Sequence, residues 1–258
     1  MAQQIRPTGS RLLRRYEGGH RHAVVCFHHA GGGMSAYRGW VQALTAHADV
    51  VLVQLKGRED RVAEPLTDRL DDLAVELARE ICELPYEDVV LVGHSMGATV
   101  AWAVADAIWA VYRRRVRVVV SAQAPPPYAG RSLPGIPEVL GEPAGESAGE
   151  SAGTGAPGPA DGLHAETLAA DLAWMAREFP TFVPRALPVD LHCVFAAHDH
   201  LLGPGAAAGW AALTTGRFSH RTVDGGHMYL LTDPAPLLAL AGAVAGEGSA
   251  AKEVGVDQ

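Results

Sequence analysis

Short apolar runs that alternate with helical patterns are the feature that most restricts how this sequence can fold. The runs lack the polar alternation of half-exposed strands, which is typical of strands buried on both faces of a sheet. Between them lie apolar residues at helical spacing, such as Leu70, Leu73 and Leu77. This order predicts an α/β fold with a mostly parallel central sheet, right-handed crossovers and helices on both faces. The expected strands are residues 24–27, 50–55, 89–92, 116–122, 189–197 and 218–223.

A segment of different composition interrupts this alternation between the fourth and fifth expected strands. We expect residues 1–258 to form a single domain, in which residues 125–187 are a lid inserted above the carboxyl ends of the strands. Residues 141–162 are dominated by Gly, Ala, Pro, Ser and Glu. Such a segment buries too little apolar surface to offset the entropy of ordering it, so we expect it to be disordered. The polar tail, residues 246–258, is expected to be flexible.

The composition of the chain narrows the classes of function. Its 258 residues carry a formal net charge of −8 and are 48% hydrophobic, which suits a globular domain with a substantial core. The acidic balance argues against a nucleic-acid partner, because nucleic-acid binding needs a basic face. No run of about 18 apolar residues is present, so we expect no contact with a membrane through a spanning segment.

The cysteines and the first residues bear on the compartment. Cys26, Cys82 and Cys193 form no CxxC pair, and each lies in or beside an apolar run. We therefore expect reduced core cysteines and a reducing compartment. Residues 1–15 are polar and basic with no apolar stretch behind them, unlike a secretory signal. A cytoplasmic, monomeric protein is the expectation.

The segment Gly93-His94-Ser95-Met96-Gly97 fits the pattern G-x-S-x-G. It directly follows an expected strand and precedes a helix, which is the context that a nucleophile elbow requires. The two glycines permit a sharp turn and a close approach of backbone, so the Ser95 hydroxyl is expected to project as a nucleophile. The amino end of the following helix favours negative charge. The motif predicts a serine hydrolase of the α/β-hydrolase fold.

A serine hydroxyl needs a base, and the base needs an orienting acid. His227 lies after the last expected strand and before the last helix, where the chain order Ser, acid, His places the base. Asp199 follows the strand at 189–197, so we expect it to hold the imidazole tautomer and to stabilise the imidazolium. Asp190 lies at the wrong end of that strand, and Asp224 is too close to His227 in the sequence.

Backbone amides that bind an oxyanion are expected from the residue after the nucleophile and from the first Gly-rich loop. Met96 supplies the first amide, and Ala30, with His29 as the alternative, supplies the second. No metal site is expected, because adjacent histidines such as His28 and His29 point to opposite faces of a strand. The loop lacks G-x-G-x-x-G, so no dinucleotide cofactor is expected either.

Four segments of the sequence resemble the motifs of one enzyme family, the type II thioesterases of polyketide and nonribosomal peptide biosynthesis. The segments occur in the family's order and cover both halves of the expected sheet. Tyr37 and Trp40 resemble the tyrosine and tryptophan that follow the first segment in the family. The segments are residues 27–32 (F-P-H-A-G-G in the family), 54–61 (Q-x-P-G-R-x-x-R), 93–98 (G-H-S-M-G-A) and 225–230 (G-G-H-F-Y-L).

This resemblance implies a mechanism and a partner. Ser95, Asp199 and His227 would form a triad that attacks an acyl group on the phosphopantetheine arm of an acyl or peptidyl carrier protein, and water would then release the acid. The amides of Ala30 and Met96 would form the oxyanion hole. The resemblance implies no metal and no organic cofactor bound by the enzyme itself.

Other residues in or near the similar segments bear on the substrate. We expect His29, Arg58 and Met228 to contact it. The chain departs from the family where His28 stands in place of a proline. The family's arginine-aspartate segment of the lid is reduced to Ala170-Asp171-Leu172. Because lid residues shape the acyl pocket, the substrate preference stays open.

Three alternatives to thioester hydrolysis also stay open. The same triad can hydrolyse a carboxyl ester or a lactone, and it can pass the acyl group to an amine or an alcohol instead of water. A non-catalytic binding module of the same fold is the third alternative, which the presence of all three residues of the expected triad disfavours.

Overall fold

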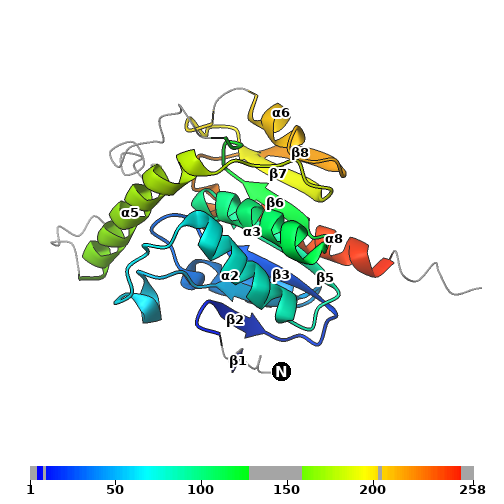
Figure 1. Ribbon diagram of the computed structural model, residues 1–258, viewed down its shortest axis with the longest axis horizontal. Helices are drawn as coiled ribbons and strands as arrows, with labels where there is room; N and C mark the ends of the chain where they lie inside the picture. Colours follow the sequence, from blue (N-terminus) through cyan, green and yellow to red (C-terminus); the bar gives the residue numbers. More distant parts are fainter. Residues whose placement is uncertain (1–4, 8–9, 128–158, 203–204, 251–258) are drawn as a thin grey trace, which may run out of the picture.

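The computed structural model describes residues 5–7, 10–127, 159–202 and 205–250, and an eight-stranded sheet forms its centre (Figure 1). The strand order is β1-β2-β4-β3-β5-β6-β7-β8, and each neighbouring pair from β4 to β8 is parallel, whereas β2 is antiparallel to both its neighbours. The predicted mostly parallel sheet is therefore confirmed. The strands are β1 (Ile5–Pro7), β2 (Leu13–Tyr16), β3 (His22–Phe27), β4 (Asp49–Val53), β5 (Asp88–His94), β6 (Arg117–Ser121), β7 (Asp190–Ala196) and β8 (Phe218–Val223).

Helices cover both faces of this sheet (Figure 1). None of the described helices combines the length and the apolar composition that a membrane span requires. The α-helices are α1 (Arg38–Leu44), α2 (Leu70–Glu83), α3 (Met96–Tyr112), α5 (Pro159–Glu178), α6 (Ala206–Ala211), α7 (Tyr229–Thr232) and α8 (Ala235–Ala250), and the 3-10 turns are η1 (Met34–Tyr37), η2 (Glu59–Arg61) and η3 (Phe179–Thr181).

Alternate residues of the central strands pack into two separate apolar cores. Val25 of β3 and Leu91 of β5 belong to the core that α2 and α3 cover. Val24 and Val90, their neighbours in sequence, belong to the core that α1 and α8 cover. All four side chains are fully buried. Because both faces of these central strands are covered, the strands need continuous apolar residues, and this explains their missing polar alternation.

The first two strands, β1 and β2, are absent from the sequence prediction. Leu13 and Tyr16, at the ends of β2, are buried, whereas the two arginines between them are half-buried. Leu13 pairs with Val53 and Tyr16 with Val50 of β4. A four-residue strand with two central arginines contains no apolar run, so only its pairing with β4 identifies it.

The described part of the predicted lid contains the long helix α5 (Figure 1). The helix begins at Pro159, so residues 159–162 of the segment expected to be disordered are helical. Residues 128–158 of the predicted lid lie outside the described residues. At the carboxyl end, α8 continues to Ala250 rather than ending before the predicted tail, of which residues 251–258 lie outside the described residues.

Candidate active site

Ser95 lies at the turn between the central strand β5 and helix α3. Its backbone has φ 53° and ψ −123°, a positive-φ conformation that costs a non-glycine residue on the order of 1–3 kcal/mol. The Ser95 amide donates a hydrogen bond to the Ser121 carbonyl oxygen, and the Ala98 amide donates to the Ser95 carbonyl oxygen, both at 2.9 Å. These bonds hold the strained turn that the motif predicted.

The two glycines of the motif are required by the close approach of neighbouring backbone. A Cβ atom on Gly97 would lie 2.2 Å from the Phe27 carbonyl oxygen and 2.6 Å from that of His28. A Cβ atom on Gly93 would lie 2.2 Å from the Gly97 carbonyl oxygen. The absence of side chains at both positions therefore brings the end of β3, and the loop that follows it, directly against the Ser95 turn.

His227 and Asp199 lie beside Ser95. His227 Nε2 is 2.9 Å from Ser95 Oγ, and His227 Nδ1 is 2.8 Å from Asp199 Oδ2. The other Asp199 oxygen, Oδ1, accepts a hydrogen bond from the Leu201 amide at 3.1 Å. Asp199 and His227 are both buried. With Nδ1–H donating to the carboxylate, Nε2 is left as the acceptor for the Ser95 hydroxyl proton.

Strand pairing explains why the acid and the histidine meet. Asp199 follows β7 and His227 follows β8, and because these strands are parallel their carboxyl ends meet at one edge of the sheet. The His198 amide donates to the Gly225 carbonyl oxygen at 3.0 Å, which joins the two loops. Gly225 has φ +109°, a conformation that glycine adopts readily and that turns the chain back over the sheet.

The loop after β3, residues 28–33, contains the predicted oxyanion donor Ala30. The Gly32 amide donates to the His29 carbonyl oxygen at 3.1 Å, in a turn where Gly31 has φ +74°. Among the backbone hydrogen bonds of the described residues, none uses the Ala30 amide. Met96 is the first residue of α3, and the first amides of a helix have no partner within it. Both amides are thus available to a ligand.

His94 belongs to a buried polar network that sequence reasoning missed. His94 Nδ1 lies 2.9 Å from Ser121 Oγ, which lies 2.7 Å from the Tyr229 hydroxyl. The His94 ring centroid is 5.5 Å from that of His227 and 6.3 Å from that of His29. Burial, and then the proximity of the titratable rings of His227 and His29, hold the pKa of His94 well below its usual value, so it stays neutral. The His94 ring thus joins this hydrogen-bonded network to the surroundings of the His227 ring.

The three residues predicted to contact the substrate lie in two environments. His29 and Met228 are half-buried; His29 belongs to the loop of Ala30, and Met228 directly follows the histidine of the expected triad. Arg58, in contrast, is 3% exposed and donates to both carboxylate oxygens of Asp171. These contacts occupy the guanidinium, and the assignment of Arg58 as a substrate contact stays a prediction. Asp171, on α5, is the aspartate of the reduced lid segment noted in the sequence, but its spacing from Arg58 did not indicate that the two residues pair.

Two buried histidines lead us to expect stability that falls in acid. Both His28 and His94 are at least nine-tenths buried. Burial, and next the charge of Arg58, hold the pKa of His28 well below the ordinary value of 6.5. The unfolded chain therefore takes up protons that the folded chain does not. We expect the free energy of unfolding to fall as the pH decreases below about 6.5, by on the order of 1 kcal/mol per pH unit for each histidine.

Thermal unfolding followed between about pH 5 and pH 8 checks this expectation. His28→Leu replaces the titratable imidazole with an apolar side chain and should flatten the dependence of Tm on pH. His47→Gln is the matched control, because His47 is exposed and the slope should stay that of the wild type. An unchanged slope in His28→Leu contradicts the role of His28.

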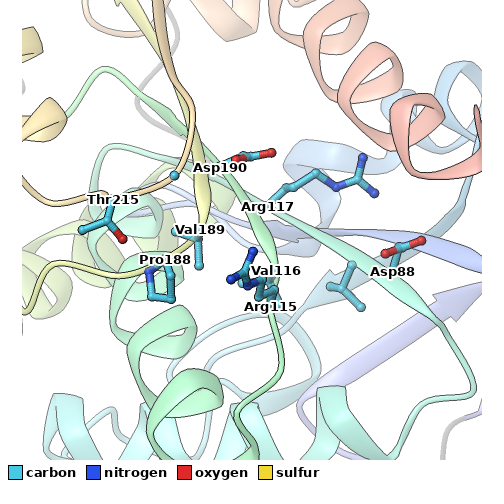
Figure 2. Close-up of a pocket in the computed structure, with 10 residues that line it drawn as sticks. Asp88, Arg115, Val116, Arg117, Pro188, Val189, Asp190 and Thr215 are labelled. Carbon is cyan, nitrogen blue, oxygen red and sulfur yellow. The ribbon is translucent and has the colours of Figure 1, made fainter. Parts of the chain in front are cut away.

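A separate cavity of about 340 Å³ opens at the opposite edge of the sheet (Figure 2). Residues at the amino ends of β5, β6 and β7 line it, among them Asp88, Arg117 and Asp190. Asp190 pairs with Arg217 at 2.8 Å. Ser95 follows the carboxyl end of β5, so the length of the strand separates this cavity from the candidate active site.

The strand order, the strained serine turn and the position of His227 after the last strand define the class of the protein as the α/β-hydrolase fold. Comparison with known proteins narrows this class. The model of the thioesterase domain family matches residues 22–138. The solved structure of RedJ, a thioesterase of prodiginine biosynthesis in Streptomyces coelicolor, is 31% identical with a TM-score of 0.71, and the match covers 88% of this chain and 91% of RedJ.

Two further relatives are also named as thioesterases. BorB, a type II thioesterase of the borrelidin biosynthetic cluster, is 26% identical with a TM-score of 0.75, over 91% of this chain and 97% of BorB. A probable cadicidin biosynthesis thioesterase of Streptomyces griseus is 31% identical over 86% of this chain, which spans 63% of the relative's length. The chain belongs to the thioesterase family, a family of hydrolases, and the resemblance seen in the sequence motifs is confirmed.

Proposed function

We propose that the protein is a serine thioesterase that hydrolyses acyl thioesters on the phosphopantetheine arm of acyl or peptidyl carrier proteins. The observation that carries this proposal is the line of hydrogen bonds from Asp199 through His227 to Ser95. Membership of the thioesterase family supports the type of bond that is cleaved. The biosynthetic pathways of RedJ and BorB support a carrier protein of polyketide or nonribosomal peptide biosynthesis as the partner.

In the acylation step, His227 Nε2 takes the proton of the Ser95 hydroxyl while Oγ attacks the thioester carbonyl carbon. The carbonyl oxygen becomes an oxyanion, which the amides of Ala30 and Met96 stabilise by about 3 kcal/mol each. Asp199 stabilises the imidazolium that His227 becomes. The carbon–sulfur bond then breaks, the imidazolium gives its proton to the leaving thiolate, and the acyl group stays on Ser95 as an ester.

In the deacylation step, water is the nucleophile. His227 Nε2 takes a proton from the water, whose oxygen attacks the acyl ester in the same oxyanion environment. The ester bond to Ser95 breaks, and His227 returns the proton to Oγ. The products are a free carboxylic acid and the unmodified enzyme. Neither step as written requires a metal or an organic cofactor.

Carrier proteins loaded with several acyl groups test this proposal by intact mass before and after incubation with the enzyme. We expect loss of the acyl mass and release of the free acid. The kcat/KM for the carrier thioester should exceed that for a nitrophenyl ester of the same acyl chain by roughly tenfold or more. A set of reactions with added amines and alcohols identifies transfer in place of hydrolysis.

Each alternative has a distinct outcome in this experiment. A higher kcat/KM for the nitrophenyl ester would favour a carboxylester hydrolase, and an amide or ester product would show an acyltransferase. No reaction with any substrate, together with no labelling of Ser95 by a fluorophosphonate, would indicate a binding module that has lost catalysis.

A further inference from the structure

Helix α5 places one acidic side chain in the interior, beside the loop that follows β3. Asp171 is fully buried, and its two carboxylate oxygens accept hydrogen bonds from Arg58 at 2.6 and 2.7 Å. Asp171 Oδ2 also accepts from the Gly31 amide at 2.8 Å. The Arg58 guanidinium donates in addition to the Gly32 carbonyl oxygen at 3.0 Å. The ion pair thus binds an amide and a carbonyl in the two residues directly after Ala30.

The glycine-rich sequence of residues 31–33 explains why this part of the loop needs hydrogen bonds from side chains. Gly31, Gly32 and Gly33 follow one another, and glycine loses more conformational freedom on ordering than any other residue. The next residues have other partners, since the Met34 amide donates to Gln54 Oε1 at 3.0 Å and the Ser35 amide to Glu59 Oε1 at 2.9 Å. The side-chain bonds to Gly31 and Gly32 therefore come from the Arg58–Asp171 pair.

We propose that Arg58 and Asp171 are positioning residues that hold the Ala30 amide where the acyl oxygen gains negative charge. This inference rests on the proposed function, because it assigns the loop an oxyanion to bind. A donor that moves by about 1 Å loses much of its effect on the transition state. Asp171 belongs to α5, so a helix of the predicted lid contributes to turnover through this ion pair.

Other contacts keep α5 in place, which allows the ion pair to be tested by itself. Trp174 Nε1 donates to the Asp68 carbonyl oxygen at 2.8 Å, and Glu178 Oε2 accepts from the Leu70 amide at 3.2 Å. These bonds lie one and two turns further along the helix from Asp171. A variant without the ion pair therefore keeps the attachment of α5 to the body of the protein.

The test uses a variant in which an apolar pair replaces the ion pair, Arg58→Met with Asp171→Leu. A well-packed apolar pair often restores the stability that is lost when only one partner of a buried ion pair is removed. The readout is the rate at which a fluorophosphonate labels Ser95. In that reaction Oγ bonds to phosphorus, fluoride leaves, His227 takes the hydroxyl proton, and the phosphoryl oxygen gains charge as an acyl oxygen does.

We expect Asp171→Ala to lower both Tm and the labelling rate, the latter by about 10- to 100-fold. The apolar pair should restore Tm while labelling stays slow, because Gly31 and Gly32 still lack their partners. Recovery of labelling together with Tm would overturn the proposal, since a purely structural pair predicts that result. Should the apolar pair not fold, Asp171→Asn decides, and a wild-type labelling rate in it overturns the proposal.

Asp68→Asn is the matched control. Asp68 forms an ion pair with Lys56 at 2.8 Å, and Lys56 lies close to Arg58 in the sequence. In the described structure this pair makes no hydrogen bond to residues 31 and 32. Its labelling rate should equal that of the wild type. The labelling assay contains no carrier protein, so a wild type that labels but does not hydrolyse carrier thioesters refutes the proposed function and leaves this test intact.

Discussion

Ser95→Ala is expected to lower kcat for acyl-thioester hydrolysis by about a million-fold, because it removes the atom that forms the acyl-enzyme bond. Losses of this size follow removal of the nucleophile in other serine hydrolases, where the remaining rate comes from the oxyanion donors and from binding. His227 Nε2 is 2.9 Å from the hydroxyl that is lost, so the substitution leaves this base without its nucleophile. Release of acyl groups from a loaded carrier protein, followed by intact mass, measures the change.

The substitution should leave the fold intact. Alanine retains the side-chain volume up to Cβ, and the hydrogen bonds of the Ser95 backbone to Ser121 and Ala98 do not involve the hydroxyl. Tm should therefore stay within about 2 °C of the wild type. Ser35→Ala, at an exposed serine, is the matched control and should keep full activity. Substantial thioester hydrolysis by Ser95→Ala would refute the assigned nucleophile.

Gly97→Ala is expected to have the second largest effect, on both stability and turnover. The added Cβ would lie 2.2 Å from the Phe27 carbonyl oxygen and 2.6 Å from that of His28, and both atoms belong to backbone. Either the end of β3 or the start of α3 must move. We expect a loss of roughly 3 kcal/mol, at the upper end for overpacking, and a decrease in Tm of about 6–12 °C for a domain of this size.

The same movement separates Ser95 from the loop that carries Ala30. A shift of about 1 Å in the reacting groups costs on the order of a hundred-fold, so kcat should fall by at least that factor. Gly39→Ala is the matched control, because Gly39 also lies in a helix but its Cβ would meet nothing within 4 Å. That variant should be unchanged or slightly more stable. Equal effects of the two substitutions would contradict the close approach at Gly97.

Residues at the ends of strands were predictable from the sequence. Ser95 follows β5, Asp199 follows β7 and His227 follows β8, and the carboxyl ends of parallel strands meet at one edge of a sheet. Once the apolar runs predict a parallel sheet, position relative to the strand selects Asp199, which follows β7, over Asp190, which begins it. The assignment of these residues as catalytic stays a prediction until the substitutions are made.

Residues whose partners come from distant elements were not predictable in this way. The sequence predicts Arg58 as a substrate contact, whereas the structure pairs it with Asp171, 113 positions away. His94 is visible in the motif, but its link through Ser121 to Tyr229 depends on how β6 and α7 are packed. Strand β2 has too few apolar residues to be recognised without β4 beside it.

The sequence by itself determined the type of fold, the serine turn and the strand ends that carry the chemistry, because these depend on neighbouring residues and on the periodicity of apolar side chains. Only the tertiary structure decided which distant side chains contact the loops that carry these residues. The orientation of α5 places Asp171 against Arg58 and Gly31. Such a contact depends on the packing of whole elements, and neither segment carries a local pattern that encodes it.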